Sequence, residues 1–236
     1  MNAVGAKIVR PPAYCRRQRA GVIVAVLCAG LVYASAVRAD GVPCPERVSV
    51  TVAATDPQMA CAAADEALAF LDANGLSTTE PIEISIVSRL PKEGVAEALG
   101  CYDQRDRQIH VLDLASCRSK GRILGLPVDA ELHRSVIAHE VAHAAAAPRF
   151  AVARPGLAAQ EYIACVAQIS VLSEGTRARI LERHPGTGFE TTAEISSTIY
   201  LMDPNYFAAQ AWRHFMKPEN GAAFLRRLLA GELPPD

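Results

Sequence analysis

Hydrophobic and polar positions follow two different periods along the chain. Residues 47–53 and 81–88 alternate between apolar and polar side chains, and this alternation predicts two strands. Residues 98–103 and 108–113 flank a polar four-residue turn and are predicted to pair as a hairpin. We therefore expect a sheet in the first half of the protein.

Helical patterning predicts one helix among these strands and several after them. Asp56 as N-cap and Pro57 as the first helical residue begin an alanine-rich helix that runs to Leu71. Further helices are predicted over residues 129–147, 157–172, 174–184, 189–202 and 204–230. Strands followed by helices predict the α+β class, with an N-terminal mixed sheet and a mainly helical C-terminal half.

The first 39 residues have the order of a secretory signal peptide, and residues 40–236 are expected to form a single domain. A basic start is followed by an apolar run from Ala20 to Tyr33, and small residues then lead to cleavage near Ala36 or Ala39. The alternative is a membrane anchor that stays attached, but the apolar run is short for a stable span. We expect a secreted or periplasmic protein that contacts a membrane only through an uncleaved signal segment.

Removal of this segment makes the chain acidic. Residues 1–39 hold six basic and no acidic residues, so 18 basic and 25 acidic residues remain, a net charge of −7. No run of basic residues survives, which argues against nucleic acid as a partner. We expect a monomer.

Five cysteines remain after the signal peptide, and an oxidising compartment should pair some of them. Cys101 and Cys117 flank the expected hairpin and a loop, and they form one plausible bridge. Cys44 and Cys61 form another. Cys165 would be left over, buried on a helix.

The segment His139-Glu140-Val141-Ala142-His143 carries the chemistry. Two histidines four positions apart lie on one face of a helix, one turn from each other, and can bind one zinc ion. Glu140 follows the first histidine directly, so its carboxylate is placed to accept a proton from water at the metal and to pass it to a leaving amine. This helix is expected to end at Pro148.

A catalytic zinc usually has a third protein ligand. The metzincin continuation needs Gly at position 146 and His at position 149, and this chain has Ala146 and Arg149. The best candidate is Glu161, near the start of the next helix, which a turn around residues 148–155 would return antiparallel to the first. Weaker candidates lie farther along the chain: Glu174, Glu190 and Glu194.

The motif at residues 139–143 followed by Glu161-Tyr162-Ile163-Ala164 resembles the gluzincin metallopeptidases, over about residues 96–172. The resemblance implies a small zincin-like domain with Zn²⁺ held by His139, His143 and Glu161. It implies Glu140 as general base and a peptide or protein as substrate. It also implies an exposed edge strand before the active helix, where substrate backbone pairs, and the strand predicted at 108–113 stands in that place.

One position departs from the family. Many gluzincins have Asp where this chain has Cys165, and that Asp orients a zinc-binding histidine. A peptidase therefore has two rivals: a non-catalytic zinc-binding protein that binds peptides or an envelope partner, and a structural envelope protein whose motif is accidental. Tyr162, Tyr200 and Tyr206 are candidate donors to a developing oxyanion, although packing is the commoner role for each.

Overall fold

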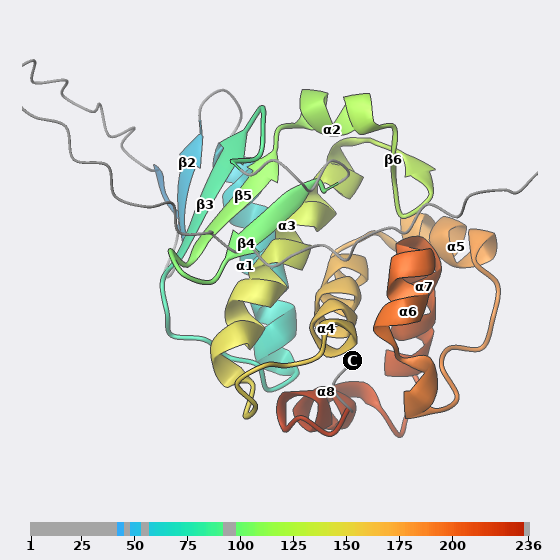
Figure 1. Cartoon of the computed structure of the whole chain (residues 1–236). Helices are drawn as coiled ribbons and strands as arrows, with labels where there is room; N and C mark the ends of the chain where they lie inside the picture. Colours follow the sequence, from blue (N-terminus) through green and yellow to red (C-terminus); the bar gives the residue numbers. More distant parts are fainter. Residues whose placement is uncertain (1–41, 45–47, 53–56, 92–97, 234–236) are drawn as a thin grey trace, which may run out of the picture.

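Five strands form one mixed sheet in the computed structural model, which describes residues 42–44, 48–52, 57–91 and 98–233 (Figure 1). The strands are β1 (Val42–Pro43), β2 (Val48–Val52), β3 (Ile82–Val87), β4 (Gly100–Asp103) and β5 (Gln108–Leu112). Their order is β1-β2-β3-β5-β4. The inner strands β2, β3 and β5 run parallel, and β1 and β4 are antiparallel to their neighbours.

Alternation along the inner strands gives the sheet its buried face. In β3, Ile82, Ile84 and Ile86 are buried while Glu83 is exposed. In β5, Ile109 and Val111 are buried in the same way. The alternation seen in the sequence at 81–88 is thus the two-residue period of a strand with one face on the core.

The strand predicted to be an exposed edge is not one. β5 pairs with β3 on one side and with β4 on the other, so its backbone faces a neighbour along both flanks. The edge is β4, the first strand of the predicted hairpin. The hairpin itself is confirmed, because Gly100 pairs with Val111 and Asp103 pairs with Gln108 in antiparallel register.

Helices make up most of the chain after β5, and the predicted α+β class is confirmed. The larger ones are α1 (Pro57–Ala73), α3 (Ala130–Ala146), α4 (Leu157–Ser170), α5 (Glu174–Arg183), α7 (Pro204–Phe215) and α8 (Gly221–Leu229). Shorter ones are α2 (Leu114–Lys120), α6 (Ser197–Met202), η1 (Ala147–Arg149) and η2 (Thr192–Glu194). Asp56, the predicted N-cap of α1, lies outside the described residues.

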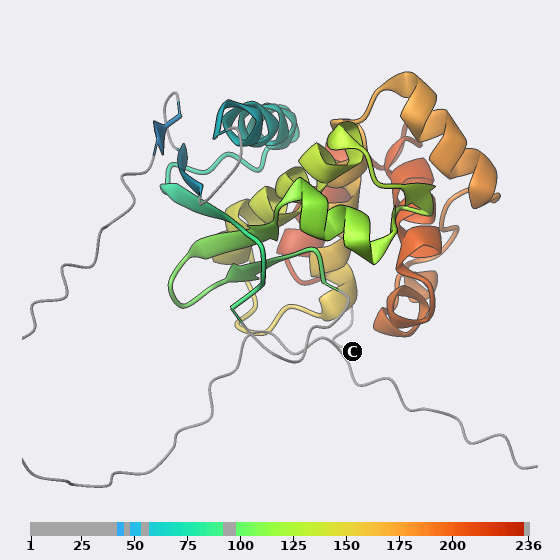
Figure 2. The same ribbon diagram turned by 90° about the horizontal axis from the view of Figure 1, so that it is seen from above.

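Helix α3 lies between the sheet and the helical half (Figures 1 and 2). It packs against β4 and β5, against α1, and against α4. Ala138, Ala142 and Ala145 on α3 are fully buried, as are Ala164 and Ala167 on α4. Because such small side chains set the distance between packed helices, α3 and α4 can approach closely.

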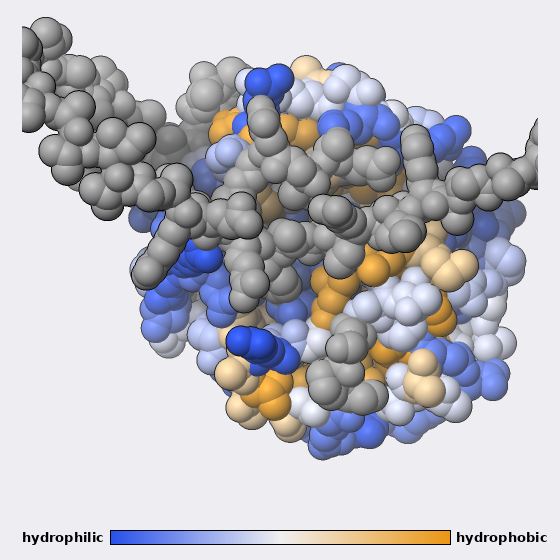
Figure 3. Space-filling view, in the orientation of Figure 1, coloured by the Kyte–Doolittle hydropathy of each residue, from blue (hydrophilic) through white to orange (hydrophobic). Residues whose placement is uncertain are grey.

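The hydrophobic core continues through α4 and α7. On the face seen in Figure 3, hydrophilic residues prevail at the margins and hydrophobic ones show toward the middle, some of them where Figure 1 draws α4. Tyr162 of α4 and Phe207 of α7 are among the largest fully buried side chains. Tyr162 also hydrogen bonds with His214 of α7, at 2.7 Å from its Nδ1.

The predicted C-terminal helices are shorter and more numerous in the structure. The segment 189–202 contains only η2 and α6 rather than one helix. The segment 204–230 divides into α7 and α8, with Pro218 in the break. A proline inside a helix removes a backbone donor and clashes with the preceding turn, which explains the division.

Three short elements between β5 and α3 were not predicted: α2, β6 (Arg122–Ile123) and β7 (Leu126–Pro127). The signals for α2 are present in the sequence. Asp113 caps its first turn by accepting from the Ser116 amide at 2.7 Å, and Gly121 follows its last turn with φ 97°.

The structure confirms one of the two predicted disulfides. Cys44 and Cys61 are joined by a disulfide, as predicted. Cys101 and Cys117 are not joined, so that pairing is wrong. Cys117 is buried, with its Sγ 3.5 Å from the carbonyl oxygen of Leu112, while Cys101 lies on the edge strand β4. Cys165 is an unpaired thiol buried on α4, as predicted.

The predicted signal peptide, residues 1–39, lies outside the described residues. Within the described ranges, no helix combines the length and the apolar character that a membrane crossing requires.

Candidate metal centre

The two histidines of the motif lie next to each other on helix α3. The helix begins at an N-cap, where Asp129 accepts from the Leu132 amide at 2.8 Å. About two and a half turns into the helix, His139 is followed one turn later by His143 on the same face. Their Nε2 atoms are 3.1 Å from each other. Since two imidazole nitrogens face each other at this distance, the pair offers two ligands for one cation.

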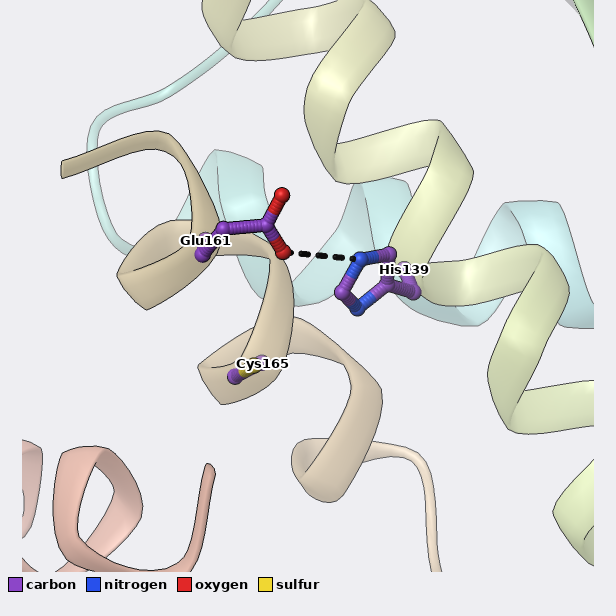
Figure 4. Close-up of side chains that lie close together, drawn as sticks. All are labelled: His139, Glu161 and Cys165. Carbon is purple, nitrogen blue, oxygen red and sulfur yellow. Dashed lines mark ion pairs between the residues drawn. The ribbon is translucent and has the colours of Figure 1, made fainter. Parts of the chain in front are cut away.

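Glu161, on the neighbouring helix α4, is the third candidate metal ligand beside the two histidines. It lies in the second turn of α4, with an exposed fraction of 7%. Its Oε2 is 3.4 Å from His139 Nε2, and its Oε1 is 3.7 Å from His143 Nε2. Figure 4 shows the carboxylate of Glu161 pointing from its helix toward the ring of His139.

The three groups fit a metal ion. Oε2 of Glu161 is buried without a hydrogen-bond partner, and such an atom is costly unless a cation or another donor satisfies it. Zinc with tetrahedral ligands at 2.0–2.1 Å places those ligands about 3.3 Å from one another. The separations of 3.1, 3.4 and 3.7 Å lie around that value. Two imidazoles and a carboxylate are also a ligand set that zinc takes.

Cys165 lies one turn after Glu161 on α4 (Figure 4). The ligand atoms of His139, Glu161 and Cys165 all lie within 4.8 Å of one another, so this cluster could hold a metal ion. Burial raises the pKa of the Cys165 thiol, and the neighbouring His139 opposes the shift. Cys165 could therefore share a cation with His139 and Glu161.

Gln168 orients His139, and the sequence analysis missed it. Nδ1 of His139 lies 3.1 Å from Oε1 of Gln168. An amide oxygen only accepts, so Nδ1 carries the proton and Nε2 keeps its lone pair toward Glu161 and His143. The amide of Gln168 in turn donates to Ser135 Oγ at 3.4 Å, and Ser135 donates to the Leu132 carbonyl at 2.7 Å. An acceptor that orients His139 thus lies three residues after Cys165 on α4.

Glu140, next to His139 on α3, packs against the edge strand β4. It is buried, with an exposed fraction of 6%. A Cβ added at Gly100 of β4 would lie 2.8 Å from both Cγ and Oε1 of Glu140, so the glycine makes room for this side chain. Burial raises the pKa of Glu140 to about 7, with the charge of His139 and the Tyr102 backbone amide opposing the shift. A carboxylate with that pKa can both take and return a proton near neutral pH.

Burial and mutual charge set the remaining pKa values. Burial lowers the pKa of His143 to about 4, although the charge of Glu161 opposes the shift. Burial alone would lower the pKa of His139 as well, but the contacts with Cys165 and Glu161 hold it well above its usual value. Burial would raise the pKa of Glu161, and the two histidines keep it below its usual range.

A cavity of about 470 Å³ opens beside these residues. His139, Glu140, Cys165 and Gln168 contribute to its lining, together with Gly100 of β4. Tyr200 of α6 also lines it. Burial raises the pKa of Tyr200, and the charge of Glu161 and a hydrogen bond with it add to the shift, so the Tyr200 hydroxyl stays protonated. The cavity thus joins the metal-ligand cluster to a carboxylate and to a hydroxyl donor.

The other candidates from the sequence lie elsewhere. Glu174 is exposed in the first turn of α5. Glu190 and Glu194 lie in one exposed turn, where the Glu190 amide donates to Glu194 Oε2 at 3.1 Å. Tyr162 is engaged with His214, and Tyr206 is 39% exposed at the start of α7. Of the three tyrosines, Tyr200 is the one that reaches the cavity.

The fold and the site define an α+β protein with a buried cluster that could hold a metal ion next to a cavity. The chain belongs to a family of unknown function, DUF6639, whose sequence profile matches residues 48–236. That range includes the cluster, the cavity and all of the sheet except β1. No curated protein and no solved structure matches the chain.

Proposed function

We propose that this protein is a zinc-dependent peptidase of the gluzincin type, with Glu140 as general base. The observation that carries the proposal is the convergence of His139 Nε2, His143 Nε2 and the Glu161 carboxylate at separations of 3.1 to 3.7 Å. A zinc ion with three protein ligands keeps a position open for water or substrate, which is the arrangement of catalytic rather than structural sites.

The residues of this chain then have distinct tasks. His139, His143 and Glu161 hold the ion, and Gln168 fixes the ring of His139. When bound, zinc supplies a Lewis acid that polarises a peptide carbonyl and acidifies a water molecule.

Glu140 moves the proton of the reaction. It takes a proton from water as the water oxygen bonds to the carbonyl carbon. It returns that proton to the amide nitrogen as the C–N bond breaks, so the products are a carboxylic acid and an amine. The hydroxyl of Tyr200, protonated and in the same cavity, can exchange its hydrogen bond with Glu161 for one to the carbonyl oxygen as negative charge develops there.

Cys165 supports a second candidate, a zinc-binding protein without catalysis. Its thiol lies within 4.8 Å of the ligand atoms of His139 and Glu161. Together with His143, these residues would give four protein ligands, and four protein ligands close a zinc site to water. Such a centre would stabilise the packing of α3 on α4 while the cavity binds a peptide or an envelope partner.

Metal content and turnover test the peptidase. We expect about one zinc per chain by elemental analysis, and hydrolysis of a denatured protein substrate that chelation abolishes and zinc restores. Glu140→Gln should keep the zinc and lower hydrolysis at least about 100-fold, since general base catalysis contributes 10²–10⁴-fold. Glu174→Gln is the matched control, because it removes the same charge from an exposed turn of α5.

Three results would contradict these proposals. Zinc far below one per chain would exclude both metal-binding candidates and favour an accidental motif. Hydrolysis unchanged in Glu140→Gln would exclude this residue as the base. Full zinc content without hydrolysis of any peptide would favour the non-catalytic candidate.

The ligand set is tested by two further variants. Glu161→Ala should release zinc more readily in either case. Cys165→Ala should retain zinc if three ligands hold it, and should lose it if the thiol is the fourth. Competition with a chelator of known affinity measures both effects.

We also propose export, with cleavage of the signal peptide near Ala36 or Ala39. The disulfide between Cys44 and Cys61 supports this, because such bonds persist in oxidising compartments. Mass spectrometry of the mature N-terminus tests the cleavage site.

A further inference from the structure

The hairpin of β6 and β7, residues 122–127, forms part of the wall of the cavity. Arg122, Ile123 and Leu124 from this hairpin line the cavity, together with Lys120 at the end of α2. Ile123 pairs with Leu126, so the turn between the two strands consists of Leu124 and Gly125 alone. The hairpin is thus a small, defined part of the cavity wall, and the proposed reaction does not require it.

Its turn has a backbone that leucine seldom adopts. Leu124 has φ 51° and Gly125 has φ 78°. Two-residue hairpin turns with positive φ at both central positions favour Asn or Asp followed by Gly, because the Cβ of most other residues is strained there. Leu124 is nevertheless buried, with an exposed fraction of 6%. Strained residues of this kind concentrate at ligand sites, and here the strain places an apolar side chain in the cavity wall.

The same hairpin brings positive charge to the cavity. Lys120 and Arg122 both line it and are exposed to solvent. Arg122 Nη1 donates to the Gly125 carbonyl at 2.7 Å, which ties the side chain back to its own turn. A guanidinium has five N–H donors in a fixed fork, so this one bond still allows it to bind a carboxylate.

The remaining polar lining also suits an anion. Asn205 of α7 lines the cavity and carries an amide that can donate, whereas the Tyr200 hydroxyl in the same lining is hydrogen bonded with Glu161. Among the described residues that line the cavity, Glu140 is the one acidic side chain, and it is the proposed base. A protein whose mature chain carries a net charge of −7 therefore presents two cations beside its candidate metal centre.

We propose that the β6–β7 hairpin selects the substrate of this cavity, and that it takes a peptide in which a carboxylate lies next to an apolar side chain. The carboxylate binds at Arg122, with the charge of Lys120 beside it, and the apolar side chain packs against the wall lined by Ile123 and Leu124. The inference rests on the proposed function for its peptide ligand. The carboxylate is either an acidic side chain or the free C-terminus of the peptide.

Binding to the Glu140→Gln protein, loaded with zinc, tests this without turnover. Three acetylated peptides share one apolar sequence: the first has an internal Glu and an amidated end, the second has Gln and a free C-terminus, and the third has Gln and an amidated end. We expect the first or the second to bind about fivefold more tightly than the third, the upper range for a solvent-exposed ion pair. Which of the two binds better identifies the source of the carboxylate.

Charge reversal assigns the effect to the hairpin. Arg122→Glu should abolish the preference for a carboxylate, and Lys120→Glu should weaken it. Arg118→Glu is the control, because it makes the same change on an exposed position of α2 outside the cavity lining. Calorimetry measures the dissociation constants.

The inference and the proposed function fail in different ways. Equal binding of the three peptides, no binding at all, or a preference that survives Arg122→Glu and Lys120→Glu would overturn the role of the hairpin. Hydrolysis of peptides by the wild-type protein decides the peptidase separately. A carboxylate preference without any hydrolysis would support the hairpin and refute the enzyme.

Discussion

His139 is held between two different kinds of neighbour. Its Nε2 faces His143 and Glu161, and its Nδ1 faces the amide of Gln168. The second contact decides which nitrogen is free to bind a cation. A residue that fixes the tautomer of a ligand histidine is often needed for full metal affinity.

Replacement of Gln168 should therefore weaken the metal site. We expect Gln168→Leu to lower zinc affinity about 10- to 100-fold, because it removes the acceptor for the Nδ1 proton and the amide that donates to Ser135. Gln168→Glu keeps an acceptor at the same place and should retain most of the affinity. Chelator competition gives the affinities, and nitrogen NMR of the histidines reports the tautomer. Equal zinc affinity in Gln168→Leu would remove this residue from the site.

Gly100 should control the place of the Glu140 carboxylate. In Gly100→Ala, the new Cβ would lie 2.8 Å from Oε1 of Glu140, so the carboxylate must shift. We expect full zinc content and roughly a tenfold or greater loss of kcat, since a displacement of about 1 Å costs up to 10²-fold. Gly175→Ala is the control, because a Cβ there meets no atom within 4 Å. A kcat that matches this control would show that the carboxylate has room to move.

At the scale of elements, α3 is the central support of the site. It carries both histidines and Glu140, and it contacts the sheet, α1 and α4. Its first turn is fixed by the side chain of Asp129, and a 3₁₀ turn containing Pro148 follows its end. Both ends of this helix were predicted closely from the sequence, because a capping aspartate and a proline act locally.

Loss of the N-cap should destabilise the fold more than the metal site. We expect Asp129→Ala to lower the free energy of unfolding by about 1 kcal/mol, since the Leu132 amide loses its acceptor. The histidines lie beyond the capped turn, so zinc content should stay the same. Asp129→Asn supplies an equivalent cap and should restore stability. Urea unfolding of the three proteins measures the differences, and an unchanged Asp129→Ala would show that the cap contributes nothing.

At the scale of the whole molecule, the disulfide joins the start of the sheet to α1. Cys44 precedes β2 and Cys61 lies in the first turns of α1, 17 positions later. The metal cluster lies on α3 and α4, away from this bond in sequence. Stability from the bond and metal binding by the cluster should therefore be separable.

Removal of the disulfide should lower stability without emptying the site. A closed loop of this length contributes about 3 kcal/mol through the unfolded chain. We expect the double variant Cys44→Ala, Cys61→Ala to melt at a lower temperature and to bind zinc as the wild type does. Cys117→Ala is the control for loss of a buried thiol that holds no disulfide. An unchanged melting temperature in the double variant would show that the bond is not formed in the mature protein.

The sequence by itself determined what depends on neighbours along the chain. The alternation at 81–88 corresponds to strand β3. The rings of His139 and His143 lie side by side because residues four apart are about one turn from each other on the same face of a helix. The likeness of residues 139–164 to a gluzincin pattern pointed to Glu161. The α+β order followed from the same local patterns.

Only the tertiary structure decided which segments meet. In it, β4 rather than β5 is the edge strand. Gln168 contacts His139, and the β6–β7 hairpin forms part of the cavity wall. Gln168 lies 29 positions after His139, and such a contact depends on how α3 packs against α4. Packing of distant helices follows from the combined shape of many buried side chains, and no spacing along the chain encodes it.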